Sequence, residues 1–164
     1  MRSSIIAISL LLIVTIAKIN GHLCILDPPQ RGAKLPSPLY AGDNNCYKIA
    51  SNCGGVAAGS PVASYRAGSY QTITFQQNYN HWFPSNIGYM DVAISYAGDN
   101  GQYQTLYSMQ DFNAWDMVSQ TNLSVPVTFP KTKCTSCVLR VRYISNNSGE
   151  PNPDFYQCSD ITLH

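Results

Sequence analysis

Residues 70–77 (YQTITFQQ) carry the pattern that decides the fold class. Along this stretch β-branched and aromatic side chains alternate with polar ones, as is typical of a β-strand with one buried face. Similar stretches, separated by turns rich in Gly, Pro, Asn and Ser, lie at 22–27 (HLCILD), 89–96 (YMDVAISY), 102–107, 124–129 (SVPVTF), 137–145 (CVLRVRYIS) and 155–163 (FYQCSDITL). Roughly six or seven short strands predict an all-β fold, an antiparallel β-sandwich of the immunoglobulin or fibronectin type.

The remaining stretches carry four further expectations. Residues 30–68 have no clear helical period, so we predict a long, disulfide-pinned loop region after the first strand. Residues 109–118 (MQDFNAWDMV) predict one helical turn. Pro126 indicates an edge strand, because proline has no N–H to donate to a neighbour. Arg140 and Arg142 share one face of their strand, which we expect to be solvated.

Composition narrows the class of protein. The chain has 164 residues, of which 45% are hydrophobic and 12% are charged, so it fits one folded domain and not a disordered chain. A single Glu argues against a helix-rich fold. The net charge is +1 and no basic cluster appears along the sequence, which argues against a nucleic-acid partner.

The first part of the chain has the features of a secretion signal. A short basic segment at 1–4 precedes an apolar run of 13 residues at 5–17, which is shorter than the roughly 20 residues of a transmembrane helix. We therefore expect a secreted, extracellular protein with a signal peptide at 1–21. The remaining residues, 22–164, are then one domain that has no membrane contact after cleavage.

Two cleavage points fit the end of this signal. Cleavage after Ala17 would expose Lys18, and the preference for small residues before the cut slightly favours it. Cleavage after Gly21 would expose His22, and the chemistry of the histidines favours that site. The position of the new amino terminus therefore decides whether residue 22 carries a free amine.

Six cysteines lie after the signal, an even number that predicts up to three disulfides with the pairing left open. They are Cys24, Cys46, Cys53, Cys134, Cys137 and Cys158. The CxxC pair at 134–137 has a redox or zinc alternative, which the absence of a second CxxC in the sequence disfavours. Asn122 and Asn146 begin glycosylation sequons, which matter if the source is a eukaryote.

Two of the three histidines, His22 and His81, are the candidate metal ligands. At an amino terminus, His22 would offer two nitrogens, the α-amine and ring Nδ1, and His81 would offer a third. Such a nitrogen set suits Cu(II), which also binds most tightly among divalent first-row metals. We interpret His164 as an ordinary surface residue. Composition alone does not show whether the first two meet.

Several segments together resemble one family of enzymes. The segment 22–31 (HLCILDPPQR) resembles the mature start of lytic polysaccharide monooxygenases, especially the chitin-binding type-4 group and its animal relatives. Asn80-His81 resembles the loop that carries their second copper ligand. The segments 134–143 (CTSCVLRVRY) and 155–161 (FYQCSDI) resemble their last two strands. The resemblance therefore spans nearly all of the mature chain.

This resemblance implies one copper ion that alternates between Cu(II) and Cu(I). It implies ligation by the amine and Nδ1 of His22 and by Nε2 of His81, with Phe155 in the axial aromatic position. Gln157 is a weaker candidate for orienting a ligand or an oxygen species. The implied activity is oxidative cleavage of glycosidic bonds in chitin or cellulose by a monomer with an external electron donor. It needs no acid/base carboxylate pair, which suits a sequence whose few acidic residues suggest none.

Aromatic side chains are the candidates for contact with sugar rings, because an aromatic face packs well on the C–H face of a pyranose. They are Tyr40, Tyr47, Tyr65 and Trp82. Two features depart from the family pattern: residues 22–164 are short for these enzymes, and Leu23 stands where a small residue is common. Two alternatives therefore stay open. One is a copper-binding relative that does not cleave polysaccharide, and the other is a metal-free carbohydrate-binding or adhesion β-sandwich.

Overall fold

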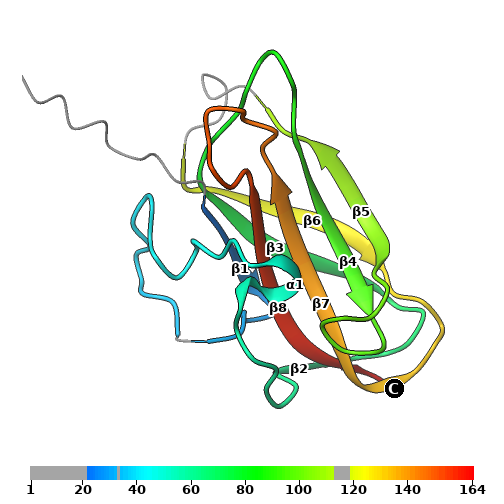
Figure 1. Cartoon of the computed structure of the whole chain (residues 1–164). Helices are drawn as coiled ribbons and strands as arrows, with labels where there is room; N and C mark the ends of the chain where they lie inside the picture. The colour runs from blue at the N-terminus through cyan, green and yellow to red at the C-terminus, as the bar shows by residue number, and fades with distance from the viewer. Residues whose placement is uncertain (1–21, 33, 113–118) are drawn as a thin grey trace, which may run out of the picture.

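The structure is a computed structural model that describes residues 22–32, 34–112 and 119–164. Two β-sheets pack face to face, and a long loop region flanks one edge of the sandwich (Figure 1). Among the described residues, no helix has the length and apolar character needed to cross a membrane.

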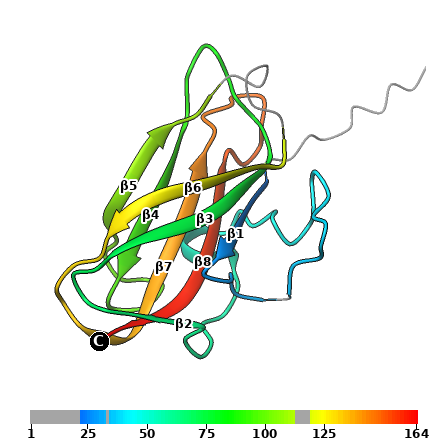
Figure 2. The same cartoon turned by 180° about the vertical axis from the view of Figure 1, so that it is seen from behind.

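The smaller sheet has three strands in the order β1-β3-β6 and is seen from its outer side in Figure 2. Its strands are β1 (His22–Asp27), β3 (Tyr70–Tyr79) and β6 (Thr121–Thr128). The larger sheet has five strands in the order β2-β8-β7-β4-β5. Its strands are β2 (Ala63–Tyr65), β8 (Asp154–Leu163), β7 (Cys134–Ile144), β4 (Tyr89–Ser95) and β5 (Gln104–Gln110). All pairs are antiparallel except β2 with β8. The predicted β-sandwich is confirmed.

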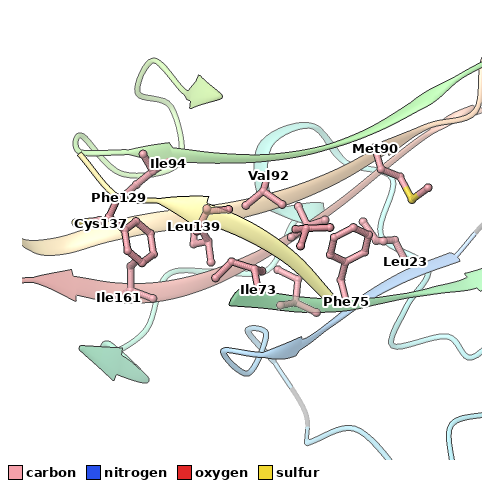
Figure 3. Packing of buried hydrophobic residues seen from close by; sticks show 14 of the residues in the cluster. Leu23, Ile73, Phe75, Met90, Val92, Ile94, Phe129, Cys137, Leu139 and Ile161 are labelled. Carbon is pink, nitrogen blue, oxygen red and sulfur yellow. The ribbon is translucent and has the colours of Figure 1, made fainter. Parts of the chain in front are cut away.

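The alternation seen in the sequence builds the core. Ile73 and Phe75 of β3 point inward from the smaller sheet, and Leu139 and Val141 of β7 point inward from the larger one. Figure 3 shows Ile73, Phe75 and Leu139 meeting between the sheets. Pro126 lies in β6, which is an edge strand, as predicted.

Two elements inside the predicted loop region were missed. These are β2 and a four-residue helical segment, α1 (Ser51–Gly54). Both are too short to show a periodic pattern, and β2 exists because it pairs with β8 far along the chain. The predicted helical turn at 109–118 is wrong at its start, because Met109 and Gln110 belong to β5; residues 113–118 lie outside the described part of the chain.

All six cysteines form disulfides, as the even count predicted. Two of them pin the loop region: Cys24–Cys46 ties it to β1, and Cys53–Cys158 ties α1 to β8. The third, Cys134–Cys137, bridges the CxxC pair at the start of β7, so this pair is a disulfide and not half of a zinc site. Both sequons are accessible, since Asn122 is exposed on β6 and Asn146 is half-buried after β7.

The two arginines of β7 do not form a solvated face, which corrects the prediction. Arg140 is only 8% exposed, and its guanidinium lies 3.7 Å from the centre of the Tyr103 ring. Arg142 forms an ion pair with Asp91 on the neighbouring strand β4. Arg140 is buried because the side chain of Tyr103, just before β5, covers this part of the outer face. This burial lowers the pKa of Arg140.

Candidate functional site

The fold brings His22 and His81 together around Tyr79. Residue 22 pairs with Tyr79 in the β1–β3 register, and His81 follows two residues after β3 ends. The ring of Tyr79 has its centre 6.3 Å from that of His22 and 5.4 Å from that of His81. Both histidines are buried, with 5% and 4% of their surface exposed, while Tyr79 is half-buried. Two residues 59 positions apart in sequence thus share one site.

Two further aromatic rings, those of Tyr47 and Phe155, also contact the histidines. With His22, Tyr79 and His81 they form what we call the histidine cluster. Tyr47 lies 5.1 Å from His22 and 6.1 Å from Phe155, measured between ring centres. Phe155 in turn lies 5.9 Å from His81 and is fully buried. Because Phe155 has no donor atom, it supplies an apolar wall beside the histidines and no ligand.

A carboxylate fixes the orientation of the His81 ring. Nδ1 of His81 lies 3.1 Å from Oε1 of Glu150, a residue of the loop between β7 and β8. Burial raises the pKa of Glu150 above its usual value. A carboxylate at one ring nitrogen fixes the tautomer and directs the other nitrogen, Nε2, away from the loop. The sequence analysis missed Glu150, and its being the single Glu of the chain was the only available signal.

A buried hydrogen-bond network holds the backbone of His81. The His81 N–H donates to Tyr143 Oη at 3.0 Å, and Tyr143 donates to Asp111 Oδ2 at 2.7 Å. Gln77 Nε2 also donates to Asp111, at 3.0 Å, and Asn80 Nδ2 donates to Gln77 Oε1 at 3.1 Å. Burial raises the pKa values of both Asp111 and Tyr143. The loop after β3 is therefore fixed to β7 through side chains that the sequence analysis did not single out.

Replacing Tyr143 with Phe should lower the free energy of unfolding by about 2–3 kcal/mol, because the buried His81 N–H and Asp111 Oδ2 both lose the hydrogen bond that they make with the Tyr143 hydroxyl. Urea unfolding measures this loss. Tyr70→Phe is the matched control, since that ring is 67% exposed, and it should change stability by less than about 0.5 kcal/mol. Equal effects of the two changes would mean that the network contributes nothing to stability.

The loop region positions His22 from the other side. Leu23 N–H donates to the Cys46 carbonyl at 2.9 Å, next to the Cys24–Cys46 disulfide. Gly42 adopts φ +78°, and a Cβ at this position would lie 3.8 Å from Cε1 of His22. The backbone of this loop therefore lies directly against the His22 ring.

The other candidate residues divide between this site and the rest of the molecule. Gln157 is buried, and its amide donates to the Asn45 carbonyl at 2.9 Å, so it holds the loop beside Cys46. Tyr40 is 68% exposed, and its carbonyl accepts from Asn78 Nδ2 at 2.8 Å near the end of β3. Trp82 is half-buried and directly follows His81.

Two residues lie at the far end of the sandwich. Tyr65 packs on Phe129, with ring centres 5.0 Å apart, and pairs with Leu163 at the end of β8. His164 lies beside them and shares a 3.2 Å hydrogen bond with Ser64. Phe155, beside the histidines, and Leu163, at this end, are eight residue steps apart along β8, which separates the two ends by about 26 Å. Tyr65 therefore cannot share a binding surface with the two clustered histidines.

The donor set at the cluster is compatible with a metal ion. No group of three or more His, Cys, Asp or Glu side chains in the described part of the chain could hold a metal. Two imidazoles from rigid, buried positions nevertheless suit a nitrogen-preferring metal, provided that a third nitrogen is supplied by an amine at residue 22.

Sequence comparison assigns no family: no family model and no curated protein matches the chain. Its structure is similar to that of an AA10 lytic polysaccharide monooxygenase from Streptomyces lividans, with 16% identity, a TM-score of 0.44, and coverage of 74% of this chain and 70% of the other. A lytic polysaccharide monooxygenase from Cellvibrio japonicus gives 14% identity, a TM-score of 0.43, and coverage of 75% and 64%. A superoxide reductase from Ignicoccus hospitalis has 11% identity and a TM-score of 0.43, with coverage of 66% of this chain and 77% of the other. These are similarities of fold at low identity.

Proposed function

We propose that the mature protein begins at His22 and binds one copper ion. The ligands would be the α-amine and Nδ1 of His22 together with Nε2 of His81. The proposal is supported by one observation above all: both imidazoles adjoin Tyr79, and Glu150 faces the nitrogen of His81 that would not bind the metal. Nitrogen ligands in this number suit Cu(II).

The activity that we propose is oxidative cleavage of glycosidic bonds in chitin or cellulose, driven by an external electron donor. Copper held at these nitrogens would supply the one-electron redox chemistry that such cleavage requires. The chain would hold both imidazoles rigid, and Phe155 would keep the adjoining wall free of donor atoms. Tyr40 and Trp82 would offer aromatic faces to sugar rings next to the histidines.

A second function, copper binding without polysaccharide cleavage, is favoured by the distribution of the aromatic residues. Of the four candidates for sugar contact, only Tyr40 is strongly exposed near the histidines. Tyr47 belongs to the histidine cluster, and Tyr65 lies at the opposite end of the sandwich. A polymer-binding face would therefore have few aromatic contacts.

Mass spectrometry of the secreted protein, with a Cu(II) titration of the same sample, tests the copper site. A chain that starts at His22 and binds one copper ion with sub-micromolar affinity supports the copper site. A chain that starts at Lys18, or one that does not bind copper, overturns the copper site. Incubating the copper-loaded protein with chitin or cellulose and a reductant then separates the two functions. Oxidised oligosaccharides indicate cleavage, and their absence favours copper binding alone.

Replacing Glu150 with Ala should lower Cu(II) affinity by about 10–100-fold, because His81 loses the group that orients its ring. Glu150→Gln should lose less, since its amide oxygen still accepts a hydrogen bond from Nδ1. Competition titration against a chelator of known affinity measures both. Asp154→Ala controls for the change in net charge, and a loss as large as that of Glu150→Ala would contradict a positioning role.

A further inference from the structure

A hollow with a basic rim lies at the end of the sandwich opposite the histidines. It has a volume of about 560 Å³ and is formed by the turn between β2 and β3, the connection between β6 and β7, and His164. Arg66, Lys131 and Lys133 contribute three exposed cations to its lining. These residues come from two segments far apart in sequence, so no basic cluster is visible along the chain.

The distribution of charge makes this end unusual. Residues 22–164 contain eight Lys and Arg side chains, and three of them line this one hollow. Elsewhere, Arg31 and Arg142 form ion pairs with aspartates, and Arg140 is buried. Within the described residues, no carboxylate forms an ion pair with any of the three cations at the hollow. Their positive charge is therefore available to a ligand.

The backbone around the hollow is held by hydrogen bonds between its segments. Ala67 N–H donates to the main-chain oxygen of His164 at 2.9 Å, and Gly68 N–H donates to the Pro130 carbonyl at 2.9 Å. Gly68 has φ +78°, and a Cβ there would lie 3.3 Å from Cγ of Lys131, so the lysine stem lies across the glycine. The fold thus fixes the backbone positions of the basic residues, while their long side chains can adapt to the ligand.

We propose that this hollow binds a negatively charged saccharide, one that carries sulfate or carboxylate groups on its sugar rings. Its volume is within the range of about 300–1,000 Å³ that holds an organic ligand and exceeds the need of a single small anion. Arginine and lysine are the usual partners of such groups.

A membrane surface fits this hollow less well. Recognition of anionic lipids generally uses about four to eight clustered Lys and Arg residues, and here there are three. The saccharide site also goes beyond the proposed copper function and does not depend on it. It lies about 26 Å from the histidine cluster, which is the span of the eight residue steps from Phe155 to Leu163 along β8. A protein held on an acidic glycan at this end would present its histidines at the other.

The test measures binding of the secreted protein to a heparin-derived hexasaccharide by calorimetry, without added copper. The Lys131→Gln, Lys133→Gln double variant should weaken binding by about fivefold to tenfold, because it removes two of the three charges at the hollow. The matched control is Lys34→Gln with Lys48→Gln, which makes the same change in net charge elsewhere and should weaken binding by less than about twofold. Raising the salt from about 0.1 M to about 1 M should abolish binding, as the Debye length falls from about 10 Å to about 3 Å.

Each outcome decides the proposal. A desulfated hexasaccharide that binds equally well assigns recognition to the carboxylates, and weaker binding assigns it to the sulfates. Equal weakening by the two double variants would overturn the site. Binding of neutral chitohexaose would overturn it as well if the Lys131→Gln, Lys133→Gln variant weakens that binding as much as it weakens binding of the heparin hexasaccharide. Binding of phosphatidylserine-containing vesicles through Lys131 and Lys133, without binding of the hexasaccharide, would also overturn the saccharide site. Copper affinity should be the same in all variants, so failure of the copper site and failure of this site are distinguishable.

Discussion

Replacing His22 or His81 with Ala should abolish tight Cu(II) binding by the mature protein. His81→Ala leaves only the nitrogens of residue 22, and His22→Ala removes the ring that would complete a chelate with the amine. Each change should cost more than the roughly 10–100-fold that follows the loss of an outer partner. Competition titration and electron paramagnetic resonance of the Cu(II) form measure the loss.

The third histidine provides the control for this pair. His164 lies at the far end of the sandwich, so His164→Ala should leave copper affinity unchanged. Because His22 and His81 are buried, thermal unfolding of both variants must show that the fold is retained. Unchanged copper affinity in both folded variants would remove the proposed copper site.

Replacing Cys53 and Cys158 with Ala should have the largest effect on stability, a loss of about 4–5 kcal/mol in the free energy of unfolding. This disulfide joins residues 105 positions apart. In the chain-entropy account, a closed loop of about 100 residues restricts the unfolded chain by about 4.7 kcal/mol. The disulfide also holds α1 against β8, where its buried sulfurs pack on Val138. Guanidinium unfolding under oxidising conditions measures the change.

The disulfide Cys134–Cys137 is the internal comparison. It joins residues only three positions apart, so the same account predicts a loss below about 2 kcal/mol for the matching double Ala variant. Equal losses for the two variants would show that loop closure does not determine how much each disulfide stabilises the fold.

Local patterns explain how far the fold was predictable. Alternation with period two located the strand that contains Ile73 and Phe75 and the strand that contains Leu139 and Val141, because each pattern needs only neighbouring residues. The same reasoning failed at β2, which has three residues and forms only when β8 lies beside it. It also placed Arg140 in solvent, because nothing nearby in sequence shows that Tyr103 covers it.

The sequence predicted which residues are the candidate ligands, but it did not predict which other side chains contact them. The sequence indicated His22 and His81 through their chemistry and through the family resemblance. Neither source pointed to Glu150, which reaches Nδ1 of His81 from a loop 69 residues further along the chain. Nor did the sequence show that Tyr65 lies at the other end from the histidines, because the parallel pairing of β2 with β8 decides this.

The amino-acid sequence thus determined the β-sandwich, the presence of disulfides and the identity of the candidate ligands, since composition and short-range periodicity contain that information. Only the tertiary structure decided which side chains meet. The β1–β3 register brings His22 to Tyr79, and two turns far apart in sequence bring Arg66 to the lysines at 131 and 133. Strand pairing is non-local, and a shift of one residue in register would turn each side chain to the opposite face. Both the histidine cluster and the basic hollow depend on that pairing.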